Sequence, residues 1–258
     1  MSIDWNAIQK AVIPIKSYED LFTRVDTSFK FSFVREIFNF KLGRLVEYIH
    51  KSLGGDLDHR YGEYEQMLTK VCTAMGKAGI GDVLALLQVV KTRQSLEDFF
   101  ARTGFDPLDV VQVFKFLIYW FVPGEKYLSG LIQADPQSRQ QLEALRAIGI
   151  RTNLELLERG RSKTGRASMA KECGLPEAVV ETHVNRADLS RMPWASKATI
   201  ANILGAGYGS LAELADAVPE KLYADFYRYG ESIGKNLKHG NEIENSHRIA
   251  KIVPRIVQ

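Results

Sequence analysis

Cysteine is scarce in this chain. Its 258 residues include two, Cys72 and Cys173, which lie far apart and outside any Cys-x-x-Cys pair. A disulfide framework and a thiolate zinc site are therefore excluded, and a reducing cytoplasm is the expected location.

Long apolar runs and a leader pattern are also missing. The longest apolar run, residues 116–122, has seven residues, whereas a membrane-spanning helix needs about twenty. The first residues include Asp4 and lack the basic stretch followed by an apolar stretch that marks a signal peptide. We expect no membrane span and no secretion signal.

Signatures of catalysis are absent too. No Gly-x-Ser-x-Gly elbow occurs, and the phosphate-loop-like spacing at 160–165 is followed by Arg166 and Ala167 where Lys and Ser or Thr are required. The histidines lack metal-ligand spacing, and the acidic segment 56–63 departs from a calcium loop. The sequence predicts no enzymatic activity, no metal and no cofactor.

Helical periodicity recurs throughout, whereas strand-like alternation is nearly absent. Apolar residues from Val34 to Leu53 recur every three or four positions behind Ser32 as N-cap, which predicts one long helix. Gly and Pro separate the other predicted helices, at 62–76, 82–91, 96–103, 107–121, 125–133, 137–147, 153–159, 165–173, 176–186, 195–204, 210–217, 219–229 and 242–256. The predicted fold class is all-α, a bundle of short helices with no sheet.

A repeated string marks the starts of four helices. Ser17, Ser95, Thr152 and Ser210 are each followed by an acid three residues later and then by an apolar pair. This is the pattern of a capping box, in which hydroxyl and acid satisfy the first amides of a helix. The last three strings start 57 and 58 residues apart, which predicts tandem copies of a unit of about 58 residues.

The stretch Asn185-x-Ala187-Asp188-Leu189-x-Arg191 and the turn at Gly149 and Ile150 carry a resemblance. Residues 79–218 resemble the helix-hairpin-helix superfamily, and within it an uncharacterised bacterial family of tandem helix-hairpin-helix domains, a domain of unknown function. The resemblance implies small helical repeats in which a Gly-apolar-Gly hairpin directs backbone N–H groups at a nucleic-acid phosphate. It implies non-enzymatic, sequence-independent binding of DNA or RNA.

The hairpins depart from that pattern in places. Where one is expected after Met192, the chain reads Pro193-Trp194-Ala195-Ser196, and residues 122–125 are also irregular. Residues 139–171 carry 8 basic against 3 acidic side chains in a chain whose net charge is +3. The candidate nucleic-acid-binding residues are Gly79, Ile80, Gly81, Arg161, Lys163, Arg166, Arg191 and Lys197.

Aromatic residues suggest an alternative function. Residues 1–130 hold 20 of the 26 aromatic side chains. Tyr119, Trp120 and Phe121 are consecutive and point about 100° apart on a helix, so that helix is either surrounded or meets another chain. With Trp194 they are the candidate partner-binding residues of a protein-interaction or scaffold module with degenerate hairpins.

The predicted organisation has four parts. An N-terminal helical region covers 1–78, a diverged helix-hairpin-helix-like repeat 79–134, a helix-hairpin-helix domain 135–230, and a basic docking helix 231–258. The sequence leaves nucleic acid and another protein open as partners.

Overall fold

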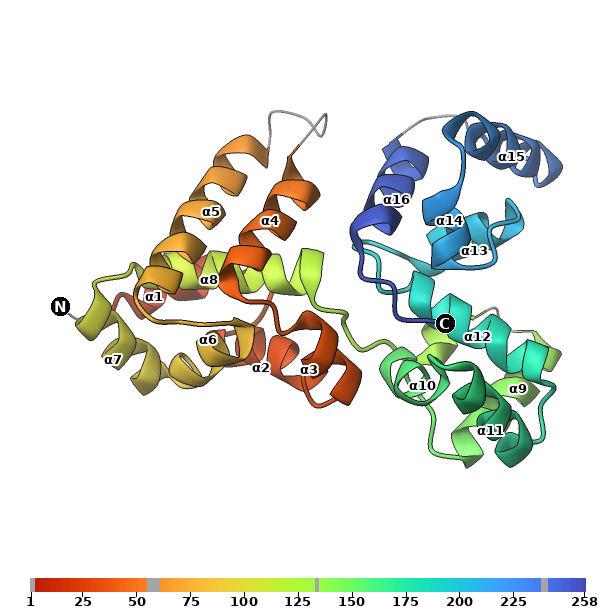
Figure 1. Cartoon of the computed structure of the whole chain (residues 1–258), viewed down its shortest axis with the longest axis horizontal. Helices are drawn as coiled ribbons and strands as arrows, with labels where there is room; N and C mark the ends of the chain where they lie inside the picture. The colour runs from red at the N-terminus through yellow and green to blue at the C-terminus, as the bar shows by residue number, and fades with distance from the viewer. Residues whose placement is uncertain (1–2, 55–60, 133–134, 238–240) are drawn as a thin grey trace. The chain divides into compact units, whose positions relative to one another are not determined.

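The chain folds into helices (Figure 1). The computed structural model describes residues 3–54, 61–132, 135–237 and 241–258, except the side chains of 241 and 242. Within these residues there are sixteen α-helices, and β-type pairing is limited to two isolated bridges. The fold is all-α, as predicted. The chain divides into two compact units, Met1–Gly124 (unit 1) and Glu125–Gln258 (unit 2).

Unit 1 is built around helix α8, which contacts α1, α2 and α5. Its elements are α1 (Trp5–Ala11), α2 (Tyr18–Ser28), α3 (Ser32–Phe38), α4 (Leu42–Leu53), α5 (Gly62–Lys77), α6 (Val83–Val89), α7 (Arg93–Thr103), α8 (Pro107–Phe116) and the π-helix η2 (Leu117–Phe121).

Aromatic rings fill the core of unit 1. The Phe121 ring centroid lies 4.8 Å from that of Phe40 and 4.9 Å from that of Tyr48. Phe114 and Phe116 of α8 are fully buried. Such ring pairs contribute about 0.5–1.5 kcal/mol beyond the area they bury. The aromatic-rich half of the sequence therefore forms an aromatic core.

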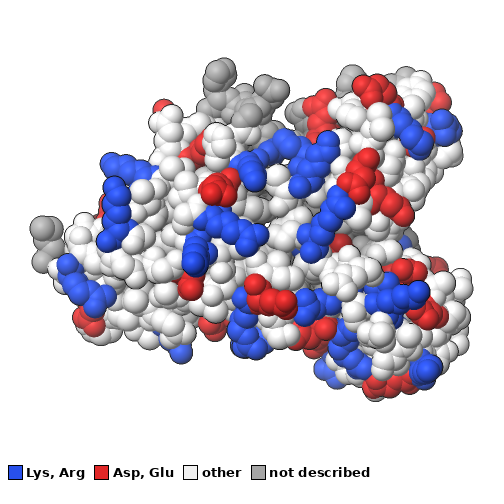
Figure 2. Space-filling model, viewed as in Figure 1, with Lys and Arg blue, Asp and Glu red and all other residues white. Residues whose placement is uncertain are grey.

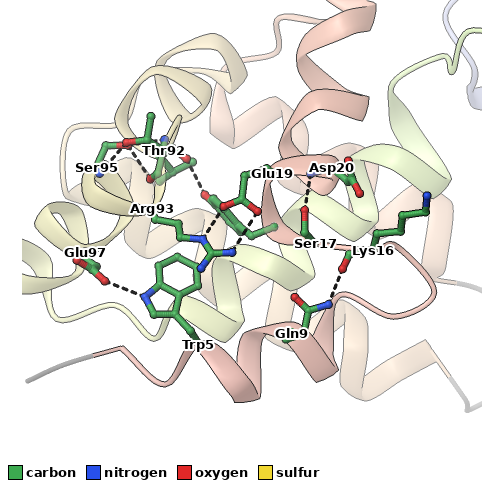
Figure 3. A network of polar contacts seen from close by, with 12 residues as sticks. Trp5, Gln9, Lys16, Ser17, Glu19, Asp20, Thr92, Arg93, Ser95 and Glu97 are labelled. Carbon is green, nitrogen blue, oxygen red and sulfur yellow. Dashed lines mark hydrogen bonds and ion pairs between the residues drawn. The ribbon is translucent and has the colours of Figure 1, made fainter.

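A polar network at the surface of unit 1 joins α1, α2 and α7 (Figure 3). Arg93 Nε donates to Glu19 Oε1 at 2.5 Å, and the guanidinium lies 4.6 Å from the ring centroid of Trp5. Trp5 Nε1 donates to Glu97 Oε1 at 2.8 Å. The guanidinium holds the pKa of Glu19 at about 2. Because the Arg93 and Glu19 side chains are both half exposed, solvent screens the pair and it adds little to stability.

The long helix predicted from Val34 to Leu53 is wrong, because α3 and α4 are separate. Between them Phe40 O accepts from Val83 N at 3.1 Å, and Leu42 N donates to Gly81 O at 3.2 Å. Asn39 Oδ1 also accepts from Leu84 N at 2.9 Å. Hydrogen bonds to a distant turn thus replace the intrahelical ones, although the apolar spacing continues through the break.

The described residues of unit 2 form the 3-10 helix η3 and eight α-helices. They are η3 (Leu128–Gly130), α9 (Pro136–Ala147), α10 (Asn153–Gly160), α11 (Lys163–Cys173), α12 (Glu177–Leu189), α13 (Lys197–Gly205), α14 (Leu211–Asp216), α15 (Pro219–Ser232) and α16 (Asn241–Ile252). The helix predicted at 242–256 ends earlier, before Pro254, and the one predicted at 125–133 is reduced to η3.

The last residues of unit 2 form an extended tail, residues 253–258 (Figure 1). Ile256 is buried, and Gln258 N donates to Arg161 O at 2.9 Å. The tail carbonyls of Pro254 and Gln258 accept hydrogen bonds from arginines of α11 and of the turn after α12. The C-terminal part therefore docks on the unit through this extended tail as well as through α16.

Helices α5–α8 and α9–α12 repeat one another at a spacing of 70 residues. The left-handed glycines Gly79 and Gly104 correspond to Gly149 and Gly174. The N-caps Thr92 and Ser162 keep the same spacing. The predicted period of about 58 residues relied on Ser95 as an N-cap. Ser95 is instead the third residue of α7, and its hydroxyl completes a capping box with Thr92.

The two compact units are a coarser division than the four predicted parts, which stay a prediction. Helices α6–α8 belong to unit 1 with the N-terminal helices, and the boundary follows Gly124. In the described part of the chain, no helix combines the length and apolarity needed to cross a membrane.

Candidate functional site

Three helix pairs are joined by the same turn. In α5–α6, α9–α10 and α13–α14 a left-handed glycine is followed by a buried apolar residue, then a variable residue and an N-cap. The glycines are Gly79, Gly149 and Gly207, with φ of 92°, 83° and 97°, and the buried residues are Ile80, Ile150 and Tyr208. Each buried residue donates its amide to the carbonyl five positions earlier, at 3.0–3.1 Å. This is a Schellman helix end leading directly into a second helix.

The side chain three residues after the N-cap determines whether the amides of the turn have a hydrogen-bond acceptor within the protein. In the α9–α10 turn, Glu155 Oε2 accepts from the amides of Arg151 and Thr152, at 2.7 and 2.9 Å. In the α13–α14 turn, Glu213 Oε2 accepts from Gly209 N at 2.7 Å. Each of these turns therefore already holds an anionic oxygen.

The α5–α6 turn has no such carboxylate, because Ala85 occupies the corresponding position. Asp82, the N-cap, directs Oδ1 to Ala85 N at 2.8 Å. Gly81 is exposed, and no acceptor among the described residues takes a hydrogen bond from the Gly81 or Asp82 amide. Gly79, Ile80 and Gly81 were predicted from the sequence as binding residues, but the importance of Ala85 was not. Aligning the three turns on their glycines would have found it.

Three of the predicted phosphate-binding cations lie where a ligand could reach them. Lys163 is exposed, and Arg161 and Lys197 are half-buried. On the face drawn in Figure 2, basic and acidic side chains are interspersed. That face does not show a large surface of one sign.

Arg166 and Arg191 were predicted to neutralise phosphates, but the structure buries both. Arg166 is 5% exposed and donates from Nη2 to Gln258 O at 2.8 Å. Arg191 is 7% exposed, forms an ion pair with buried Asp188 at 2.5 Å, and donates to Pro254 O at 3.0 Å. A buried charge needs such partners, so these guanidinium groups hold the tail inside unit 2.

The predicted partner-binding aromatic residues also divide into buried and exposed ones. Trp120 and Phe121 are buried in the core of unit 1 and Tyr119 is half-buried, so the helix that carries them is largely surrounded. Trp194 is 55% exposed, and its φ of 60° is unusual for a residue with a side chain.

The loop that carries Trp194 is fixed by Lys126. Its ammonium donates to Ser190 O at 2.7 Å and to Ala195 O at 3.2 Å, and burial lowers its pKa. Asn153 Nδ2 adds a hydrogen bond to Ser190 Oγ at 3.0 Å. The segment at Pro193 where a hairpin was expected is therefore a clamped loop between α12 and α13. The glycine turn that resembles those of α5–α6 and α9–α10 comes later, at Gly207.

Metal ligands do not gather in the described part of the chain, where no three His, Cys, Asp or Glu residues lie close enough to hold an ion. The acidic segment considered above, residues 56–63, lies mostly outside the described residues, which resume at 61.

One comparison with known proteins gives a match. Residues 136–242 match the family model described as "Domain of unknown function (DUF4332)". Unit 2 therefore contains a domain of this uncharacterised family, which spans α9 to the start of α16. Neither the curated proteins nor the solved structures give a match to the chain.

Proposed function

We propose that this is a non-enzymatic helix-hairpin-helix protein that binds the phosphate backbone of DNA or RNA without reading sequence. The α5–α6 turn is the proposed contact. The observation that carries the proposal is the different use of the three turns: two hold a carboxylate of their own, and the third leaves its amides to a ligand. A phosphate oxygen is an anionic acceptor of the same kind as the Glu155 carboxylate.

Charged residues around the α5–α6 turn favour an anion. Lys41 pairs with Asp82 in an antiparallel bridge and is exposed. Lys77, also exposed, lies in the last turn of α5, and the exposed Arg44 lies over the Phe40 ring. Asp82 opposes an anion, but its carboxylate is engaged in capping α6. In unit 2, Arg161, Lys163 and Lys197 would add weaker phosphate contacts.

The tandem helix-hairpin-helix assignment is part of this proposal. It is supported by the three shared turns and by the resemblance of residues 79–218. A cytoplasmic location is also proposed, because Cys72 and Cys173 are both free thiols. A bacterial source is proposed from the resemblance to a bacterial family alone. Burial raises the pKa of Cys72 to about 12, as suits a packing residue.

The alternative, a scaffold with an aromatic interface in the N-terminal half, has less support. Among the exposed large hydrophobic side chains of the described residues, only Ile13 belongs to unit 1. Of the residues that suggested the interface, Trp120 packs against the ring of Tyr61 and Phe121 against the ring of Tyr48.

The experiment that tests the proposal places a carboxylate in the α5–α6 turn. Ala85→Glu recreates the position of Glu155, so the new side chain should occupy the amides of Gly81 and Asp82. We expect its affinity for a short DNA duplex, measured by fluorescence anisotropy at low salt, to fall at least tenfold. The salt dependence of the remaining binding should become shallower.

Gln88→Glu is the matched control. It adds the same charge to the same helix at an exposed position one turn further on, from which it cannot reach back to the turn. We expect a loss of less than threefold. Equal losses in the two variants, or wild-type binding that does not change with salt, would show that the turn is not the contact.

A further inference from the structure

A groove beside Trp194 lies outside the hairpin turns. Its volume is about 570 Å³, within the range of small-molecule sites. One side is formed by the loop after α12 and by α13, and the other by α16. The polar residues that line it are Ser196, Thr199, Asn202, Asn245 and Ser246. None of the described lining residues is charged.

Trp194 is held in place at the edge of this groove. Its left-handed backbone conformation, with a φ of 60°, is strained for a residue other than glycine. The Lys126 ammonium binds carbonyls on both sides of it, at Ser190 and Ala195, and so maintains that conformation. The indole ring is thus exposed on a loop that already has a fixed conformation. Less conformational entropy is lost when a ligand binds to such a loop, so binding is favoured.

The groove offers the chemistry that recognises a nucleobase. An indole face is a stacking surface for any base. Asn202 and Asn245 come from different helices, and each carboxamide pairs a donor with an acceptor, as the edges of the bases do. Lys197, the first residue of α13, is half-buried next to the groove and supplies a positive charge for an adjoining phosphate.

We propose that this groove binds an unpaired base of single-stranded nucleic acid, stacked on Trp194. This inference deepens the proposed function and rests on it, because the ligand is the same kind of polymer. It adds a second site, in unit 2, that distinguishes single strands from duplexes: bases inside a duplex are stacked on one another and cannot enter the groove.

The test compares three labelled probes by fluorescence anisotropy. They are a short single strand of DNA, an abasic strand of the same length, and a duplex. Wild-type protein should bind the base-bearing strand at least about tenfold more tightly than the abasic strand, as expected from the energy of stacking one base. Equal affinity for these two strands overturns the inference without any mutation.

Two substitutions of Trp194 sharpen the test. Trp194→Ala should weaken single-strand binding about tenfold or more and leave duplex binding unchanged, whereas Trp194→Phe should retain most of it. Unchanged single-strand binding in Trp194→Ala, or an equal loss for duplex and single strand, overturns the inference. Ala85→Glu tests the two sites separately. If the α5–α6 turn is not a contact, this variant binds the duplex as well as wild type does, and that result does not depend on the outcome for the Trp194 variants.

Discussion

Units 1 and 2 each contain one copy of the repeated four helices, but they differ in the kind of residue that they bury. In unit 1, the buried polar residues among those described are two serines, Ser28 and Ser52. In unit 2 they are Thr152, Asn153, Arg166, His183, Asp188, Ser190, Arg191 and His247. The glycine turns and N-caps therefore define the helix framework, while the core they enclose can be aromatic or ionic.

The 70-residue spacing shows which buried residues of unit 1 and unit 2 occupy equivalent positions. Leu96, Val113 and Phe121 of unit 1 correspond to Arg166, His183 and Arg191 of unit 2. The two arginines are tolerated because carbonyls of Pro254 and Gln258 accept their hydrogen bonds. The polar core and the tail of unit 2 therefore depend on each other.

The largest effect is expected from breaking the buried ion pair. Asp188→Ala leaves the Arg191 guanidinium buried without its carboxylate, so unit 2 should lose about 3–5 kcal/mol of unfolding free energy. Urea unfolding combined with hydrogen exchange resolved by unit would measure it, with unit 1 as the internal reference.

The matched variant for this pair takes its residues from unit 1. Asp188→Ile with Arg191→Phe introduces the side chains found at Ile118 and Phe121, and it should cost less than the single substitution because no charge remains buried. A double variant less stable than Asp188→Ala would contradict the correspondence between the two cores.

Between pH 6.5 and pH 4, the loss of stability in acid should fall mainly on unit 2. Burial, assisted by the charge of Arg186, lowers the pKa of His183 to about 4 from an ordinary value near 6.5. The folded unit therefore binds this proton less well than the unfolded chain does. The contribution of neutral His183 to the unfolding free energy of unit 2 is fully present above pH 6.5. It decreases by about 3 kcal/mol as the pH falls to 4.

His183→Gln removes that titration while offering an amide to Gln141, which now contacts His183 Nε2 at 2.9 Å. The stability of unit 2 measured at pH 7 and at pH 4 should differ less in this variant than in the wild type. The same pH dependence in both proteins would assign the effect to other groups.

A smaller effect is expected where helices approach closely. A Cβ at Gly160, the last residue of α10, would lie 2.6 Å from Met169 Cε and 2.6 Å from Val184 Cγ2. Gly160→Ala should therefore destabilise unit 2 by about 1–3 kcal/mol. The residue at the corresponding position of unit 1 is the buried Val90, so this approach is special to unit 2.

Gly43→Ala is the control for that substitution. Gly43 lies within α4, and no atom lies within 4 Å of an added Cβ. The same change should therefore stabilise unit 1 by about 0.5–1 kcal/mol. Thermal unfolding followed separately for each unit would give opposite signs for the two variants, and equal signs would contradict the packing described for Gly160.

The sequence predicted those features that depend on neighbouring residues. Ser17, Thr152 and Ser210 cap helices as expected. The interruption between α3 and α4 could not be predicted from spacing, because its hydrogen bonds come from a turn some forty residues further along the chain. Tertiary pairing there overrides a continuous apolar stripe.

The candidate site was harder to predict than the fold. Arginines such as Arg166 and Arg191 are typical of a phosphate-binding surface. Their burial became evident only from the position of the tail in the structure. The role of Lys126 in fixing the Trp194 loop joins residues 64 and 69 positions apart, which no local motif records. The absent carboxylate at Ala85 was visible in the sequence, but only once the three turns had been aligned.

The extended tail also sets an order for the synthesis of the protein. Unit 1 is complete once residue 124 has been made, and it can fold while the chain is still growing. The guanidinium groups of Arg166 and Arg191 must wait for carbonyls that are made 92 and 63 residues later. During that interval each guanidinium group lacks one of the carbonyl acceptors that it uses in the folded protein, although Arg191 already has Asp188 as its ion-pair partner. The polar core of unit 2 is therefore complete only after the tail has left the ribosome.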